Sequence, residues 1–299
     1  MLAQKGKLFT LSMLSIVLCP QASYTQKKIV RTINIEQAPP HFTYEPAITI
    51  WIHGTTILNR KEYKASINNY KGLKLINCLT PLEPLLAAFI RIDTDNPDNM
   101  HKMYSFLWSG KLSFKSRLKA SVVLYHQLMH LVDNYMKTFN VCPKIRIITH
   151  SHGGNVALNL ARIYARVGIK LAIDELILLA CPVQRETSCF LEHTMFRSVY
   201  ALYSKLDFVQ VIDPQGFYDG NIWHIFSKRR FDWHHKLMQA EIRINKKRLT
   251  HNAFQKPSFL NIVPAIVAEL EKWRTLPENK PESHLRLCVS YKSIVKNKI

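Results

Sequence analysis

The sequence of 299 residues predicts one large domain built on a doubly wound, mostly parallel α/β sheet. Short runs rich in β-branched residues alternate along the chain with longer stretches of helical periodicity. Several short runs, such as residues 176–181, are apolar throughout, which is typical of strands covered by helices on both faces. In such a sheet, side chains that bind or react are expected just beyond the carboxyl ends of the strands.

The first residues predict an export signal. Lys5 and Lys7 precede the apolar run 8–18, which is too short to cross a bilayer comfortably. We therefore expect residues 1–23 to be a signal peptide that directs the protein to the periplasm or out of the cell. An uncleaved leader, or lipidation at Cys19, would instead keep the protein on a membrane.

The chain is strongly basic, with a formal net charge of +20 and an isoelectric point of about 9.8. Lysine and arginine are denser at 228–230, at 246–248 and in residues 281–299, which are expected to form a basic C-terminal tail. Such a charge favours anionic partners, among them an anionic membrane surface. No recognised nucleic-acid motif accompanies the charge, so no specific nucleic acid is expected as a partner.

The metal-ligating residue types do not form a metal signature. The six cysteines lack the paired spacing of a zinc site or of a disulfide framework. His126 and His130 share a helix face at a metal-compatible spacing, but no third ligand accompanies them. The sequence therefore gives no sign of a metal site.

The expected elements follow one another in the strand-and-helix order of a parallel sheet. Alternating side chains indicate an edge strand at 31–36 and a half-exposed strand near an edge at 240–244. A long amphipathic helix is expected over 114–139. Further strands are expected directly after Pro143 and at 47–52, 103–108, 176–181 and 199–203.

The α/β domain is expected over residues 24–280, with an insert at 57–100. This insert is too apolar for a solvated loop. We expect it to be partly helical and to cover the site as a lid that forms an acyl pocket. The alternative is a helix packed on the sheet with extra surface turns.

One strand ends in a sharp turn that carries a serine. Ser151 lies in Thr149-His150-Ser151-His152-Gly153-Gly154, between the strand after Pro143 and a helix that ends near Gly168. This segment matches the nucleophile elbow G-x-S-x-G, with Thr149 in place of the first glycine.

A strand-to-helix elbow suits nucleophilic catalysis. It projects the hydroxyl of Ser151 above the sheet and directs the amide of His152, at the start of the helix, toward a reacting oxygen. In the alternative interpretation the turn is structural and Ser151 only caps the helix.

An acid and a base are expected past later strands. Asp207 follows the strand 199–203, and His251 follows the strand 240–244. An acid that orients a histidine, and a histidine that takes the serine proton, would occupy these places. Asp213 is the alternative acid. Alternative bases are His224, His234 and His235, of which the last two precede the final expected strand.

Over roughly residues 45–275 the chain resembles an α/β-hydrolase of the esterase and lipase kind. The resemblance rests on His53-Gly54-Thr55, on the serine elbow, and on the placement of Asp207 and His251. It implies that Ser151 attacks an acyl group, that His251 acts as base and then acid, and that Asp207 holds the imidazole tautomer. It also implies an oxyanion hole formed by the amides of His152 and of Thr55 or Thr56. The chemistry that it implies needs no metal and no organic cofactor.

The sequence therefore predicts an exported serine hydrolase that cleaves carboxylic esters of small molecules or lipids. A thioesterase, an acyltransferase or an amidase would use the same three side chains. A non-catalytic module of the same fold, which binds anionic surfaces or polymers through its charge, is the remaining alternative.

Overall fold

The structure is a computed structural model that describes residues 28–35, 47–55, 72–75, 102–168, 171–212, 227–281 and 283–291. The expected signal peptide, most of the insert at 57–100, Thr56, Asp213 and His224 lie outside these residues. Among the helices of the described part, none is long and apolar enough to cross a membrane.

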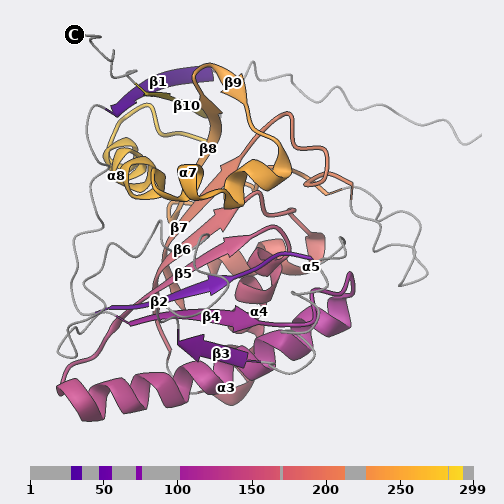
Figure 1. Cartoon of the computed structure of the whole chain (residues 1–299), viewed down its shortest axis with the longest axis vertical. Helices are drawn as coiled ribbons and strands as arrows, with labels where there is room; N and C mark the ends of the chain where they lie inside the picture. The colour runs from indigo at the N-terminus through magenta and orange to yellow at the C-terminus, as the bar shows by residue number, and fades with distance from the viewer. Residues whose placement is uncertain are drawn as a thin grey trace, which may run out of the picture.

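A mostly parallel sheet of ten strands forms the centre of the described chain. Its order is β1-β10-β8-β7-β6-β5-β2-β4-β3, with the short strand β9 paired to β8. Only β3 and β9 run antiparallel to their neighbours, among the described strands. Figure 1 shows β1 and β10 at one end of the stack, β3 at the other, and the arrowheads of β2, β4 and β5 pointing the same way. The bounds are β1 Lys28–Ile35, β2 Ala47–Ile52, β3 Gly72–Leu75, β4 Lys102–Leu107, β5 Lys144–His150, β6 Ile173–Leu179, β7 Phe196–Tyr203, β8 Leu237–Ile244, β9 Lys247–Arg248 and β10 His284–Tyr291.

Helices cover both faces of this sheet. Helices α3 and α4 pack on one face, and α7 and α8 pack on the other. In Figure 1, α3 runs along the β3 end of the sheet, and α8 lies toward the β1 end. The bounds are α3 Phe114–Phe139, α4 Gly153–Val167, α5 Arg185–Ser188, η1 Cys189–Glu192, η3 His251–Gln255, α7 Pro257–Leu260 and α8 Val263–Arg274.

The two faces separate the core into two clusters. Along β2, Ile48, Ile50 and Ile52 are buried against the α3 and α4 layer, whereas Trp51 is buried against the α7 and α8 layer. Burial of each such apolar side chain stabilises the folded state by about 1.5–3 kcal/mol. The prediction of a doubly wound, mostly parallel sheet is therefore confirmed.

The strand at 240–244 was expected to be half exposed near an edge of the sheet, and this prediction was wrong. β8 lies between β7 and β10, and Glu241 is buried. Arg286 of β10 donates to Glu241 Oε2 from Nε at 2.9 Å and from Nη2 at 2.6 Å. Arg243 donates from Nε to Glu241 Oε1 at 3.2 Å. The alternating pattern therefore reflects a buried ion pair, since a carboxylate enters a sheet interior only when it is paired.

The expected basic tail also needs correction. Residues 284–291 form β10, which pairs in parallel with both β1 and β8. Its Leu285, Leu287 and Val289 are buried on one face, which is why this segment belongs to the core despite its basic surroundings. The insert at 57–100 contributes a strand as well, since β3 pairs with β4.

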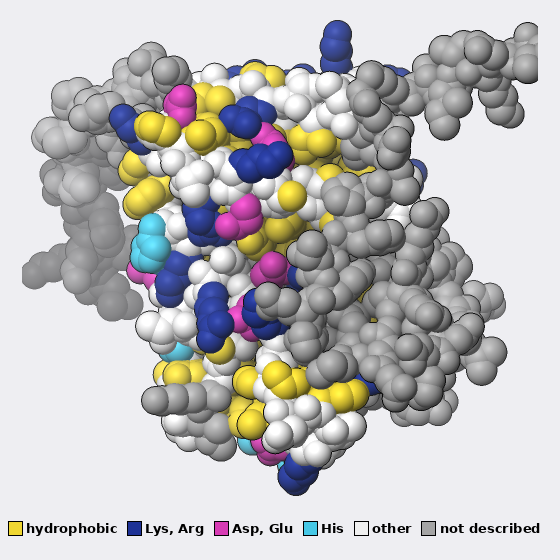
Figure 2. Space-filling view, turned by 90° about the vertical axis from the view of Figure 1, so that its left-hand side faces the viewer, with side chains coloured by type: hydrophobic (Ala, Val, Ile, Leu, Met, Phe, Trp, Pro, Cys, Tyr) yellow, Lys and Arg dark blue, Asp and Glu magenta, His cyan; other side chains and the backbone are white. Residues whose placement is uncertain are grey.

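The positive charge is partly compensated on the surface. Figure 2 shows Lys and Arg interspersed with Asp and Glu over the described part of one face. Ion pairs within the described chain include Arg31 with Glu269, Lys272 with Glu269, and Arg197 with Asp174. Ion pairs at the surface typically contribute about 0–1 kcal/mol to the free energy of unfolding. Their main effect is therefore on the surface potential.

Candidate active site

The turn between β5 and α4 forms a strained elbow at Ser151. The residue adopts a positive φ of 52°, which is uncommon for any residue other than glycine. Its amide donates to the carbonyl of Leu179 on the neighbouring strand at 2.8 Å. Thr149, which stands where the elbow pattern has glycine, is buried and donates from its hydroxyl to the Ile177 carbonyl at 3.2 Å. A threonine is accommodated there because its polar atom has a partner.

Two glycines allow the elbow to approach β2 closely. A Cβ on Gly153 would lie 2.5 Å from the Ile52 carbonyl oxygen and 2.6 Å from that of His53. A Cβ on Gly54 would lie 2.7 Å from Ser151 Cβ. These distances are too short for any side chain. The absence of a Cβ at the two glycines therefore allows the start of α4 and the loop after β2 to lie close together at the serine.

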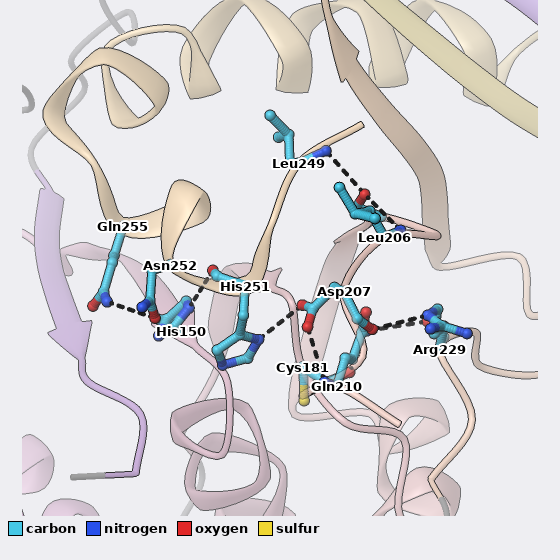
Figure 3. Close-up of polar contacts among 11 residues, drawn as sticks. His150, Cys181, Leu206, Asp207, Gln210, Arg229, Leu249, His251, Asn252 and Gln255 are labelled. Carbon is cyan, nitrogen blue, oxygen red and sulfur yellow. Dashed lines mark hydrogen bonds and ion pairs between the residues drawn. The ribbon is translucent and has the colours of Figure 1, made fainter. Parts of the chain in front are cut away.

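An acid and a base meet beyond β7 and β8 (Figure 3). His251 Nδ1 lies 2.8 Å from Asp207 Oδ2, and the Asp207 side chain is fully buried. The other carboxylate oxygen, Oδ1, accepts from the amide of Gln210 at 3.0 Å. Because a carboxylate oxygen accepts here, Nδ1 carries the hydrogen of this contact, and Nε2 lies on the side of the ring away from Asp207. Asp207 is thus the aspartate in contact with His251, while the alternative Asp213 lies outside the described residues.

A buried serine that the sequence did not single out ties the two loops together. Ser204 Oγ accepts from the amides of Leu206 at 3.3 Å and Leu249 at 3.1 Å. The first amide belongs to the Asp207 loop and the second to the segment before His251. Gln210 adds a further tie, since its Nε2 donates to the Cys181 carbonyl at 2.8 Å. No sequence pattern reveals these links, because Leu249 and Cys181 are distant along the chain from Ser204 and Gln210.

The His150 side chain, which the sequence places only in the elbow, contacts the His251 loop. Its Nε2 lies 3.1 Å from the carbonyl oxygen of His251, and the two rings are 4.6 Å apart between centroids. Burial lowers the pKa of His150 to about 3, so its ring is neutral near pH 7. The residue before Ser151 therefore contacts the loop of the expected base.

His152 follows Ser151 and begins the turn into α4. Burial, followed by the nearby Arg117 and then His251, holds the pKa of His152 well below its usual range. Asn155 Nδ2 donates to His152 Nδ1 at 3.4 Å and to the Pro182 carbonyl at 3.1 Å. The backbone of His152 thus lies at the amino end of a 15-residue helix, where amides favour negative charge.

The loop after β2 is fixed by His53 and Trp108. Trp108 Nε1 donates to the His53 carbonyl at 2.9 Å, and the Trp108 amide lies 3.3 Å from His53 Nε2. His53 Nδ1 then donates to the Gly54 carbonyl at 2.7 Å. Within the described residues, the buried Thr55 Oγ1 has no hydrogen-bond partner. Thr56, the other expected oxyanion donor, lies outside the described part.

The topology around these residues follows a known order. Ser151, Asp207 and His251 come from the turns after β5, β7 and β8, in the chain order serine, aspartate, histidine. A serine on a strand-to-helix elbow of a mostly parallel sheet, followed by that order of partners, characterises the α/β-hydrolases. The fold is that of an α/β-hydrolase.

Several solved esterases and lipases have structures similar to this fold at low scores. The esterase domain of a Rhodothermus marinus protein aligns with a TM-score of 0.38 and 11% identity over 77% of this chain and 90% of that chain. An esterase of Pyrobaculum calidifontis gives a TM-score of 0.31 and 14% identity, covering 86% and 70%. A hormone-sensitive lipase from a metagenome library gives 0.33 and 11%, covering 83% and 67%. No protein-family model and no curated protein matches the sequence. The chain's own topology and site geometry therefore carry the assignment.

Within the described residues, the other histidine candidates lie away from Ser151 in the fold. The rings of His234 and His235 contact each other at a tilt of 38° before β8, at the amino end of the strand that His251 follows. His126 and His130 are exposed on α3. Among the described residues, no group of three or more His, Cys, Asp or Glu side chains is arranged to hold a metal ion.

The buried histidines predict a loss of stability in mild acid. Burial lowers the pKa of His53 to about 4 and that of His150 to about 3, from 6.5. Below pH 6.5 the unfolded chain binds protons that the folded chain does not, so the free energy of unfolding falls as the pH falls toward the folded values. We expect a loss on the order of 2 kcal/mol for each histidine between about pH 7.5 and pH 5, measured from urea midpoints.

The exposed histidines of α3 supply the control for this prediction. The double variant His126→Gln, His130→Gln should show the same dependence on pH as the wild type, because these side chains are solvated in both states. Equal urea midpoints at the two pH values would show that the buried histidines do not resist protonation.

Proposed function

We propose that this protein is a serine hydrolase that cleaves carboxylic esters through an acyl-enzyme. The observation that supports it best is the contact of His251 Nδ1 with the buried Asp207 Oδ2 at 2.8 Å, on a loop whose His251 carbonyl contacts His150, the residue before the strained Ser151. A hydroxyl at such an elbow, a neutral imidazole and a buried carboxylate are the groups needed for nucleophilic acyl transfer.

In the first half-reaction, Ser151 Oγ attacks the ester carbonyl carbon while His251 Nε2 takes the hydroxyl proton. The carbonyl oxygen becomes an oxyanion, which the amides of His152 and of Thr55 or Thr56 stabilise. The bond from carbon to the alcohol oxygen then breaks, and the imidazolium of His251 gives its proton to the departing alkoxide. The products of this half are an alcohol and an acyl group esterified to Ser151.

In the second half-reaction, water attacks the acyl carbon and His251 takes one of its protons. Collapse of the new tetrahedral intermediate returns that proton to Ser151 Oγ and releases a carboxylic acid. Asp207 stays ionised throughout, holds the Nδ1–H tautomer and stabilises the positive imidazolium. No step requires a metal or an organic cofactor.

The fluorophosphonate reaction tests this proposal directly. We expect a fluorophosphonate probe to label the wild-type protein and the Ser151→Ala variant to remain unlabelled, because the probe forms its covalent bond with an activated serine oxygen. Labelling is read by mass spectrometry of the modified peptide. An unlabelled wild type, or labelling that persists without Ser151, would exclude the mechanism.

A panel of p-nitrophenyl esters of increasing acyl length then defines the substrate class, since it reports turnover and the size of the acyl pocket together.

Export by residues 1–23 and attraction to an anionic membrane surface remain predictions from the sequence. Recovery of the protein outside the cytoplasm would support the first of them.

A further inference from the structure

The imidazole of His150 contacts several parts of the candidate site at once. Its backbone ends β5 directly before Ser151. Its Nε2 lies 3.1 Å from the His251 carbonyl oxygen. On the other side, a Cβ built on Gly54 would lie 3.1 Å from its Nδ1, which places the expected oxyanion loop against the ring. One buried side chain therefore joins the serine elbow, the base loop and the loop after β2.

The chemistry of this contact fixes the hydrogen on His150. A carbonyl oxygen only accepts, so the ring nitrogen that faces it must carry the hydrogen. The ring is neutral, because burial lowers its pKa to about 3, and a neutral imidazole has a single N–H. The Nε2–H of His150 is therefore committed to His251.

His251 is consequently held at two points. Asp207 holds its ring through Nδ1 at 2.8 Å, and His150 holds its main chain through the carbonyl at 3.1 Å. A contact with the ring alone does not fix the peptide group of His251, on which the direction of the side chain also depends. With both contacts present, the direction of Nε2 is fixed, and orientation of a proton acceptor controls the rate of transfer.

We propose that His150 is a positioning residue that sets His251 for proton transfer from Ser151. The proposal rests on the serine-hydrolase function above. It assigns His150 no contact with the substrate, and its effect passes through His251. A neutral donor suits this place, since a permanent cation beside His251 would oppose the positive charge that His251 acquires during turnover.

The variants His150→Phe and His150→Gln test this role in the full-length protein. Phenylalanine keeps a ring of similar size without a donor, whereas the Nε2 of glutamine can reach the position of the histidine Nε2. With p-nitrophenyl acetate we expect His150→Phe to lower kcat about tenfold with KM within about twofold, the scale of one lost hydrogen bond. His150→Gln should retain most of the wild-type kcat.

The control is His126→Phe, which makes the same substitution on the exposed face of α3 and should leave kcat unchanged. Wild-type kcat in His150→Phe, or equal losses in the Phe and Gln variants, would overturn the positioning role in favour of simple packing. If His150→Phe does not fold, judged by its thermal unfolding, His150→Gln is compared with His150→Asn, whose amide is too short to reach the carbonyl. Higher kcat in the Gln variant supports the role, and equal values overturn it.

These results separate the two proposals. A wild type that neither reacts with a fluorophosphonate nor hydrolyses any ester contradicts the proposed function itself. A wild type that does both, with His150 variants that behave like it, contradicts only the role of His150.

Discussion

His251→Ala and Ser151→Ala are each expected to reduce ester turnover by roughly 10⁴- to 10⁶-fold, because removal of either the base or the nucleophile disables the whole proton-transfer unit. Both side chains lie at the end of the sheet, outside the two core clusters, so the fold should survive. The measurement is kcat with p-nitrophenyl acetate, with far-UV circular dichroism to verify the fold. Asp207→Asn should reduce kcat less than either of these variants. The base remains in this variant, and only its orientation and the stabilisation of its positive charge are weakened.

His234→Ala is the matched control for the loss of His251. His234 lies before β8, at the amino end of the strand whose carboxyl end leads to His251, and it should retain wild-type kcat. Full activity in His251→Ala would mean that another histidine accepts the serine proton. Comparable losses in His234→Ala and His251→Ala would show that the assay reports folding rather than chemistry.

Gly153→Ala is expected to destabilise the fold, although alanine is favoured over glycine in helices by about 1 kcal/mol. The new Cβ would lie 2.5 Å from the Ile52 carbonyl oxygen and 2.6 Å from that of His53. Neither oxygen belongs to a flexible side chain, so α4 must move away from β2. Overpacking of this kind typically costs 1–3 kcal/mol, roughly, and outweighs the helical gain.

Urea unfolding measures this effect, with Gly168→Ala as the comparison. Gly168 has open space around its Cβ position but a positive φ of 73°, so alanine there meets only backbone strain of about 1 kcal/mol. We expect Gly153→Ala to be at least as destabilised and also to lose turnover, because movement of α4 displaces Ser151. A Gly153→Ala variant as stable as the wild type would contradict the close approach of α4 to β2.

Local patterns were sufficient to predict most of the sheet and one helix in full. The expected helix at 114–139 has the same bounds as α3, because its ends carry local signals: the Ser113 hydroxyl accepts from the Ser116 amide, and Asn140 ends the helix in a left-handed conformation. The elbow was also predictable, since a β-branched run, a tight turn with glycine and an amphipathic helix follow one another within 25 residues, roughly.

Other parts of the structure depend on contacts between distant segments. The charged residues of β8 and β10 neutralise each other across the sheet, so each segment alone looks more exposed than it is. Ser204 and His150 act through backbone groups of distant loops, and a backbone amide or carbonyl has no residue identity that a sequence pattern could reveal. Asp207 could be predicted because it stands directly past a strand, where the geometry of a parallel sheet already limits its surroundings.

The pairing of β1 with β10 joins the two ends of the described chain at one edge of the sheet. While the polypeptide is being synthesised, β1 emerges well before its hydrogen-bonding partner β10, because all the other described strands and helices lie between them. Among the described strand pairs, this contact therefore closes the largest loop, and such contacts form late. A nascent chain leaving the ribosome thus carries an unpaired β1 until β10 has emerged, and this is the stage at which a chaperone would protect that strand most effectively.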